Sequence, residues 1–198
     1  EGISYSNPYV SIMSRFATIL KKGTSIDLYK RPFWKNYARW KHATFPAYAE
    51  WMGFGDHSER WEVTWLVNAD LSELIARETN SPEFLSYVDE FRREAALSEK
   101  TPPERSMGRV NTTLFLVPTL SKTKQPMVDN SSEAKLSHVF PAAGWASIRT
   151  GIDNGHDDVA FIFRSSPFGS FSHSHANNND FIIHVGGKVM AMPTGYYG

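Results

Sequence analysis

The chain has 198 residues, enough for one sizeable domain or two small ones. Its formal net charge is zero and it has no long run of Lys or Arg, so it lacks the electrostatic footprint of a nucleic-acid or anionic-membrane binder. No apolar run reaches the roughly 18 residues of a transmembrane span. The absence of cysteine excludes disulfides, zinc ribbons and thiol nucleophiles. We therefore expect neither a nucleic-acid partner nor membrane insertion, and the sequence leaves the oligomeric state open.

Residues 1–97 show helical patterns. In the first helix Pro8 lies near the start and Gly23 marks the end. Apolar residues recur between them at helical spacing, which predicts a face that packs on another element: Tyr9, Ile12, Met13, Phe16, Ile19 and Leu20. A short aromatic helix is expected after Pro32.

Two further helices are predicted before residue 98. The first covers 61–78, with a buried side made of Val63, Leu66, Val67, Leu71, Leu74 and Ile75. Ser81 and Pro82 have the residue types of an N-cap and a first helical position, so they predict the start of the second. Its inward side chains are Phe84, Leu85, Val88 and Phe91.

The pattern changes at 98–109, where Thr101-Pro102-Pro103 breaks any helix. Short runs of β-branched and aromatic residues follow at 110–117, 146–150 and 159–163, while 121–137 is polar and is predicted to be a surface loop. Residues 181–185 and 189–192 flank Gly186-Gly187-Lys188, which predicts a hairpin. Helices first and antiparallel strands afterwards predict an α+β multidomain arrangement: a helical domain at 1–97, a linker at 98–109 and a β domain at 110–198.

The segment 172–181 carries the strongest chemical signal in the chain. It reads Ser-His-Ser-His-Ala-Asn-Asn-Asn-Asp-Phe and leads into a predicted strand. Imidazole exchanges a proton near neutral pH, and two His side chains separated by one residue can meet a metal or an anionic substrate. The alternative is a polar loop whose Asn and Ser side chains satisfy local backbone groups.

Residues 163–177, Phe-Arg-Ser-Ser-Pro-Phe-Gly-Ser-Phe-Ser-His-Ser-His-Ala-Asn, together with the hairpin and Gly195-Tyr196-Tyr197, resemble the heparinase II/III-like polysaccharide lyases. The likeness is greatest to polysaccharide lyase family 15, which includes alginate and heparin-type oligosaccharide lyases. The opening Glu1-Gly2-Ile3-Ser4-Tyr5 is similar to a second motif of that superfamily. The resemblance implies the C-terminal part of an (α/α) toroid followed by the start of an antiparallel β-sandwich.

The resemblance also implies that the chain is an internal fragment of a periplasmic or secreted bacterial protein. Related enzymes carry a further active-site His upstream of the Glu-Gly-x-x-Tyr motif. A toroid also needs its full ring of helices to bury each apolar face. We therefore expect residues 1–198 alone to be inactive.

The chemistry implied is β-elimination in a uronate-containing glycan: a base removes the C5 proton, the carboxylate is neutralised, and the 4-linked oxygen leaves. His173 and Tyr5 would be the proton-shuttling pair, with either one as the base, and their polar atoms should lie within about 10 Å. Tyr9 is a rival for the tyrosine role, because it lies one helical turn further along. Asn177 and Asn178 could donate to the carboxylate. Arg164 could bind it in a bidentate manner or could instead tie down the Asn-rich loop.

In the heparinase II branch, the position of His175 is a metal ligand and a carboxylate on the following strand completes the site. The corresponding segment here, 190–194, reads Met-Ala-Met-Pro-Thr and has no carboxylate. Because a structural zinc site takes about four ligands, His175 is a tentative ligand only, and no cofactor is certain. The alternative is that His175 orients His173 or binds substrate.

Other polar residues give weaker signals. His42 and His57 lie in an aromatic stretch that a surface loop explains equally well. Asp153, Asp157 and Asp158 suggest calcium, but their spacing misses the EF-hand loop and a turn is the better interpretation.

Two further functions stay open at this level. A uronyl C5-epimerase uses the same proton abstraction without breaking the chain, so it makes no ultraviolet-absorbing product. A non-catalytic glycan-binding protein would keep sugar binding after loss of Tyr5 and His173.

Overall fold

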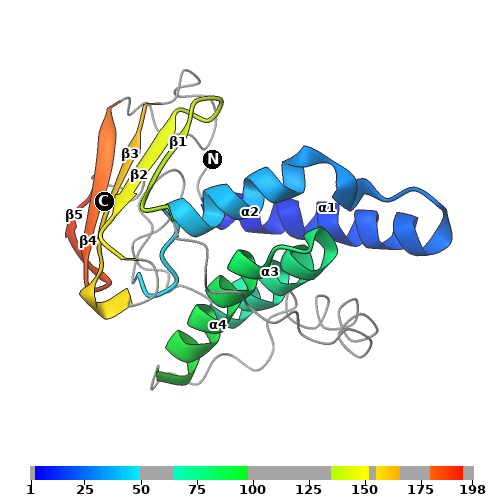
Figure 1. Cartoon of the computed structure of the whole chain (residues 1–198), viewed down its shortest axis with the longest axis horizontal. Coiled ribbons are helices and arrows are strands. Elements are labelled where there is room, and N and C mark those ends of the chain that lie inside the picture. The colour runs from blue at the N-terminus through cyan, green and yellow to red at the C-terminus, as the bar shows by residue number, and fades with distance from the viewer. Residues whose placement is uncertain (1–2, 50–64, 98–134, 152–154, 166–178, 194–198) are drawn as a thin grey trace. The chain divides into compact units, whose positions relative to one another are not determined.

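The computed structural model describes residues 3–49, 65–97, 135–151, 155–165 and 179–193. Within these ranges the chain forms four α-helices and a five-stranded antiparallel sheet, which confirms the α+β class (Figure 1). The helices are α1 (Ile3–Gly23), α2 (Pro32–Thr44), α3 (Trp65–Thr79) and α4 (Pro82–Leu97). The strands are β1 (Ser137–Phe140), β2 (Trp145–Arg149), β3 (Val159–Arg164), β4 (Asp180–Val185) and β5 (Lys188–Ala191).

The chain divides into two compact units that do not follow one cut in the sequence. The sheet unit comprises Glu1–Asn7, Trp40–Val63 and Glu133–Gly198, and the helical unit comprises Pro8–Arg39 and Thr64–Ser132. The start of α1 and the end of α2 therefore group with the sheet rather than with the other helical residues. The predicted linker at 98–109 lies outside the described residues, and the toroid and sandwich architectures stay predictions.

The sheet is a simple meander with strand order β1-β2-β3-β4-β5, each strand antiparallel to its neighbours. Its strands β2 to β5 match the predicted runs, and the predicted hairpin is confirmed. Gly186 and Gly187 form its turn with φ values of 55° and 83°, which favour glycine. A Cβ at Gly187 would also lie 2.6 Å from the carbonyl oxygen of Tyr48. Strand β1 was not predicted, because its start falls in the polar run 121–137.

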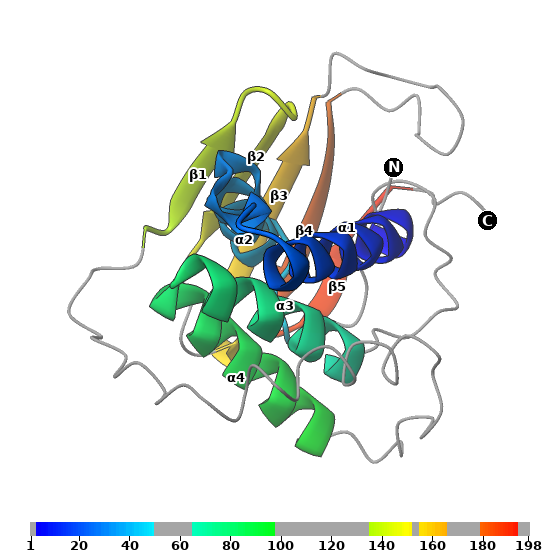
Figure 2. The same cartoon turned by 90° about the vertical axis from the view of Figure 1, so that its right-hand side faces the viewer.

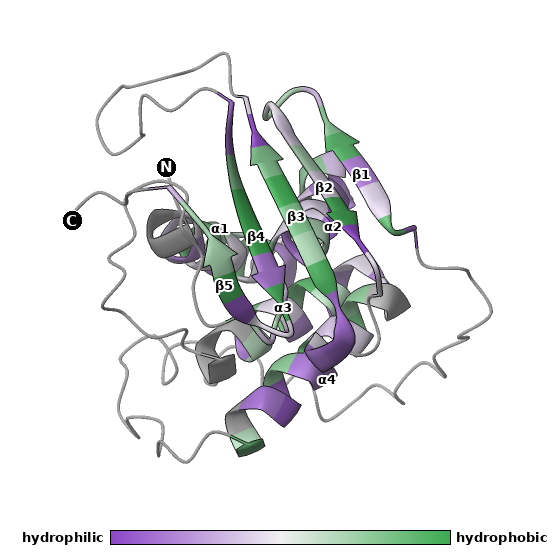
Figure 3. Ribbon diagram, turned by 90° about the vertical axis from the view of Figure 1, so that its left-hand side faces the viewer, coloured by the Kyte–Doolittle hydropathy of each residue, from purple (hydrophilic) through white to green (hydrophobic). Residues whose placement is uncertain are grey.

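One face of the central strands is buried and the other is apolar but open. Side chains alternate along each strand, so the buried positions share a face: Ser147, Arg149, Ala160, Ile162, Arg164, Ile182 and His184. Large hydrophobic side chains on the strands remain exposed: Val139, Ile148, Val159, Phe181, Val185 and Met190. Figure 3 shows β3 coloured as hydrophobic over most of its length. Such a two-sided apolar pattern is typical of a sheet covered on both faces.

In the helical unit, α3 and α4 pack side by side (Figure 2). Six of the predicted apolar side chains are buried, namely Leu71, Leu74, Ile75, Phe84, Val88 and Phe91, and Tyr87 is buried with them. The Glu73 carboxylate accepts hydrogen bonds from Arg77 and from Arg92 of the neighbouring helix. The predicted helices after Pro32 and after Ser81 are confirmed.

The predicted packing face of α1 is wrong. Tyr9, Ile12, Met13, Phe16 and Ile19 are all exposed, and the buried face is made of Val10, Ser14, Ala17 and Thr18. The cause is Tyr29, in the short 3-10 helix Leu28–Lys30. Its hydroxyl donates to the carbonyl oxygen of Ser14 at 2.9 Å and lies 2.9 Å from Thr18 Oγ1. Because Ser14, Ala17 and Thr18 are small, the Tyr29 side chain can approach α1 on their side. Its hydrogen bonds to Ser14 and Thr18 then determine which face of the helix is buried.

A membrane-spanning helix is not found in the part of the chain that the structure describes, since none of its helices combines sufficient length with sufficient hydrophobicity.

Replacing Tyr29 by Phe should lower the free energy of unfolding by about 1–3 kcal/mol, because the buried Ser14 carbonyl and Thr18 hydroxyl lose their partner. Urea unfolding measures the change. The matched control is Tyr9→Phe, whose ring is 55% exposed and which should shift stability by no more than about 0.5 kcal/mol. Equal effects of the two substitutions would contradict the assignment of the buried face.

Candidate functional site

The histidine motif lies in the connection between β3 and β4, and the sheet holds both ends of that connection together. Arg164, the last residue of β3, pairs in register with Asp180, the first of β4. One residue further out, Ser165 Oγ donates to Asn179 Oδ1 at 2.9 Å, and Asn179 adopts a φ of 63°. His173, His175, Asn177 and Asn178 lie between these anchors but outside the described residues. The ladder nevertheless fixes where their segment leaves and re-enters the sheet.

Arg164 occupies the buried face at this end of the sheet. Only 5% of its surface is exposed, although it ends a strand. Its neighbours in register are Trp145 on β2 and Asp180 on β4. Burial lowers the pKa of the Arg164 guanidinium, while the Asp180 carboxylate acts in the opposite direction. The two roles predicted for Arg164 from the sequence, a contact to substrate or to the Asn-rich loop, both stay predictions.

The start of α1, which carries Tyr5, belongs to the same sheet unit. The backbone of Tyr5 is helical, and its side chain lies outside the described part. Two residues later, Asn7 Oδ1 accepts a hydrogen bond from Lys41 Nζ at 3.0 Å. Lys41 is almost fully buried, and this burial lowers the pKa of its amine to about 7. Lys41 thus ties the first turns of α1 to the end of α2.

An aromatic pair continues this series of contacts to the sheet. Trp40, beside Lys41 on α2, lies edge-to-face with Trp145, with ring centroids 5.3 Å apart and planes at 73°. Trp145 packs against the buried pair Ile162 and Ile182 and is the register partner of Arg164. Contacts within the sheet unit therefore run from the segment after Tyr5 to the strand end that precedes His173.

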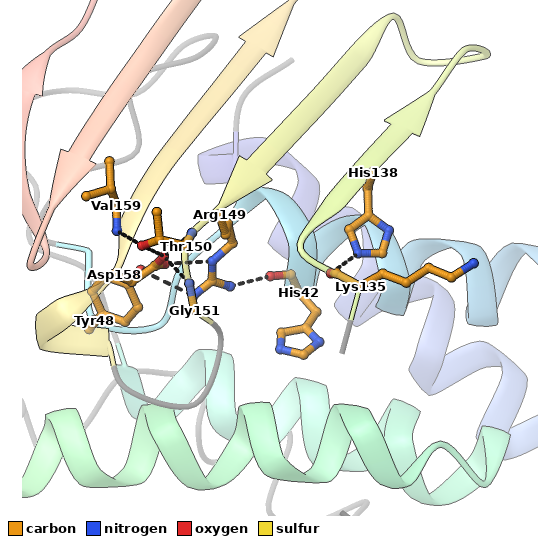
Figure 4. A network of polar contacts seen from close by, with 9 residues as sticks. All are labelled: His42, Tyr48, Lys135, His138, Arg149, Thr150, Gly151, Asp158 and Val159. Carbon is orange, nitrogen blue, oxygen red and sulfur yellow. Dashed lines mark hydrogen bonds and ion pairs between the residues drawn. The ribbon is translucent and has the colours of Figure 1, made fainter. Parts of the chain in front are cut away.

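The opposite end of the sheet carries a second polar cluster, built around the buried Asp158 carboxylate (Figure 4). Its Oδ2 accepts from the Tyr48 hydroxyl and from Arg149 Nε, the latter at 2.8 Å. Its Oδ1 accepts from the backbone N–H groups of Thr150 and Gly151, both at 2.9 Å, and from Thr150 Oγ1 at 3.2 Å. Five donors satisfy the carboxylate, so this cluster is structural and offers little to a cation.

The same cluster connects the segment after α2 to the sheet. Arg149 also donates to the Tyr48 hydroxyl oxygen at 3.2 Å and to the His42 carbonyl oxygen at 3.3 Å. Burial, followed by the charges of Arg149 and His138, lowers the pKa of the His42 imidazole to about 3, so His42 stays neutral. Burial and the Asp158 charge raise the pKa of Tyr48, which keeps its hydroxyl protonated as a donor.

Sequence reasoning missed this cluster and interpreted part of it differently. Asp158 had been considered with Asp153 and Asp157 as a calcium or turn candidate, whereas it accepts bonds from the protein and follows a 3-10 helix, Gly155–Asp157. His42 lies in helix α2 rather than in a surface loop. The residue types around Asp158, just before strand β3, do not indicate that its hydrogen-bond partner Tyr48 lies about 110 positions earlier in the sequence.

Of the two other predicted site residues, Tyr9 lies within the described residues and His175 does not. Tyr9 is exposed and belongs to the helical unit, so its proposed role at the histidine loop stays a prediction. His175 lies outside the described residues. Strand β5 offers no carboxylate or imidazole, and no group of three metal-ligating side chains occurs among the residues described. The tentative role of His175 as a metal ligand therefore stays a prediction.

The part of the chain that contains the sheet matches a known protein family. The family model described as "Heparinase II/III-like, C-terminal" matches residues 133–198, the last third of the chain and all five strands. The match supports the heparinase II/III-like superfamily for these residues, and it suggests a polysaccharide lyase family with a polysaccharide substrate. A search of curated proteins found no significant match.

Replacing Asp158 by Asn should lower the free energy of unfolding by about 3–5 kcal/mol at pH 7, because it leaves Arg149 buried without its countercharge. The Tyr48 hydrogen bond and the Arg149 charge outweigh burial and lower the pKa of Asp158 in the folded state. Its stabilisation is therefore present above the unfolded pKa of about 3.9 and is lost as the pH falls below it.

Urea unfolding at pH 7 and at pH 3 tests this expectation. The gap between the parent and Asp158→Asn should shrink at pH 3. Asp157→Asn, at the exposed neighbouring position, is the control and should change stability by at most about 0.5 kcal/mol. A gap of the same size at both pH values would show that the Asp158 charge contributes nothing.

Proposed function

We propose that the chain is part of a polysaccharide lyase that cleaves uronate-containing glycans by β-elimination, with Tyr5 and His173 as the proton-transferring pair. The observation that carries the proposal is the family match over 133–198, which contains the Ser172-His173-Ser174-His175 motif. The finer assignments, namely the uronate, the two residues and their roles, rest on the motif resemblance and on chemistry.

The reaction needs two proton transfers. A base takes the C5 proton, and the electron pair of that C–H bond forms the C4–C5 double bond. The C4–O bond breaks, and the departing oxygen takes a proton from an acid. A neutral imidazole and a phenol can exchange these roles, because each group is a base in one protonation state and an acid in the other.

The contacts of the sheet unit support bringing the pair together. The segment Glu1–Asn7 and the histidine loop belong to one compact unit, although they lie at opposite ends of the sequence. The Lys41–Asn7 hydrogen bond and the Trp40–Trp145 contact connect the start of α1 with the strand end where the loop begins. A proton relay requires such convergence, since donor and acceptor must reach one sugar ring.

The direct test is a product screen with the full-length protein that contains residues 1–198. Fragments of alginate, heparan, chondroitin and ulvan should be incubated with it, and at least one should yield an ultraviolet-absorbing unsaturated uronate. Exchange of the C5 proton with solvent deuterium, without unsaturated product, would identify an epimerase instead. Binding without either reaction would favour a glycan-binding protein.

In the same protein, Tyr5→Phe and His173→Ala should each lower turnover by about 10²- to 10⁴-fold while changing KM much less, because each removes a positioned acid or base. Steady-state kinetics on the cleaved glycan measure both parameters. His156→Ala is the control for His173, since His156 is an exposed imidazole of the short 3-10 helix, at the other end of the sheet. Unchanged turnover in Tyr5→Phe, with a loss in Tyr9→Phe, would move the role to Tyr9.

A further inference from the structure

Positive charge is concentrated in one stretch of a chain whose formal net charge is zero. Residues 8–39, which belong to the helical unit, contain seven Lys or Arg side chains and a single acidic one, Asp27. The Asp27 carboxylate lies 3.2 Å from Lys21 Nζ, and Lys21 also pairs with Glu78. On α3, the Glu73 carboxylate is bound by arginines of α3 and α4. The stretch 8–39 therefore carries a local excess of cations.

Four of these cations are exposed and follow one another along α2, and we call them the basic ridge: Lys30, Arg31, Lys35 and Arg39. Lys35 and Arg39 are four residues apart, so they are neighbours on the helix surface, about 6 Å apart along its axis. Arg31 lies directly before the helix, where its carbonyl oxygen accepts from the Trp34 N–H group at 3.3 Å. The row from Arg31 to Arg39 is thus roughly 12 Å long.

The linear sequence hides this row, because residues of other kinds separate its members. Residues 32–34 are Pro-Phe-Trp and residues 36–38 are Asn-Tyr-Ala, so no run of basic residues appears. In the helix, Trp34, Tyr37 and Ala38 are buried on one side, while Lys35 and Arg39 are exposed on the other. Folding of α2 therefore gathers charges that the sequence spreads out.

An exposed aromatic ring accompanies the basic ridge. Phe33, in the first turn of α2, is 42% exposed. Its ring lies edge-to-face with Trp34, with centroids 5.2 Å apart, and stacks on Tyr37 at 6.0 Å. These contacts hold the ring while part of it stays open to solvent. The C–H faces of sugar rings pack well on such aromatic surfaces, and the anionic groups of an acidic sugar pair with Lys and Arg.

We propose that the basic ridge and Phe33 form an accessory binding site for an acidic polysaccharide, separate from the residues that transfer protons. The choice of a polysaccharide as the polyanion rests on the proposed function. A linear polyanion repeats its charge along its length, so it can pair with a row of cations along a helix. The site would hold long chains on the enzyme, and an oligosaccharide too short to reach it would gain nothing.

The first test measures binding in the full-length protein carrying His173→Ala, which prevents turnover. Polymers of alginate, chondroitin and heparan are titrated by calorimetry at several salt concentrations, with and without the ridge variant Arg31→Gln/Lys35→Gln/Arg39→Gln. The ridge variant should bind at least one polymer about 3-fold or more weakly at low salt, since each exposed ion pair contributes little alone. Its affinity should also depend less steeply on salt, because binding releases fewer counterions.

The matched control removes three exposed cations from other places, in Arg93→Gln/Lys135→Gln/Lys188→Gln. It changes the net charge by the same amount and should keep the parent affinity and salt dependence. Equal weakening in the control and the ridge variant, or no weakening in either, would overturn the accessory site. If circular dichroism shows that the ridge variant does not fold, Lys35→Gln/Arg39→Gln takes its place in the same comparison.

Duplex DNA and anionic lipid vesicles are the competing polyanions. The parent should bind both more weakly than the preferred polysaccharide at equal salt. Tighter binding of DNA or vesicles, lost in the ridge variant, would overturn the assignment to a polysaccharide.

The second test uses turnover by the full-length protein with His173 in place. The ratio of KM for the cleaved polymer to KM for its tetrasaccharide should rise in the ridge variant and stay unchanged in the control, since the site favours long chains. An unchanged ratio in the ridge variant would defeat the accessory site while unsaturated product upheld the lyase. Ridge-dependent polymer binding without unsaturated product would instead defeat the lyase and leave the accessory site standing.

Discussion

The buried Asp158 carboxylate is the interaction on which the sheet unit depends. It receives donors from two places in the sequence: Tyr48 after α2, and the segment at the end of β2 that supplies the Arg149 side chain and the backbone of Thr150 and Gly151. A carboxylate inside a protein is stable only when its lone pairs are filled, so these segments must assemble together. The helical end that carries Trp40 and Lys41 is thereby held against the strands, which places aromatic and cationic groups at the far end of the sheet.

The two ends of the sheet each bury one arginine, and the two side chains have different surroundings. At one end Arg149 has a partner for each nitrogen it uses, and the polar groups there neutralise one another. At the other end Arg164 is also buried, next to the half-buried Trp145 indole, and its register partner Asp180 favours the charged form of the guanidinium. Because Arg149 pairs with Ala160, four strand positions, roughly 13 Å along the strands, separate the two arginines.

The sequence predicted the parts of the fold that depend on local pattern, because periodicity and turn chemistry report directly on backbone geometry. The hairpin around Gly186 and Gly187, the helix that starts at Pro82 and the α+β class are of this kind. The predicted packing face of α1 was wrong, since the Tyr29 hydroxyl forms hydrogen bonds with Ser14 and Thr18, on the face opposite the larger apolar side chains. The role of Asp158 was likewise invisible, as its partner Tyr48 is set by tertiary contact. The histidine motif is recognised from its residue types, its catalytic role comes from the family resemblance, and its geometry stays a prediction.

Tyr48 also constrains which sequences can occupy this fold. A Cβ at Gly187 would press on the Tyr48 carbonyl oxygen, and one at Gly155 would collide with the Tyr48 ring itself. Two separate turns of the sheet therefore approach the same residue, but only the contact at Gly155 depends on the Tyr48 side chain, since Gly187 meets the backbone carbonyl and has a φ of 83°. Among natural relatives, a smaller residue in place of Tyr48 should accompany a side chain at the position of Gly155, while Gly187 should stay glycine. Such co-variation would mark this contact in sequences for which no structure has been determined.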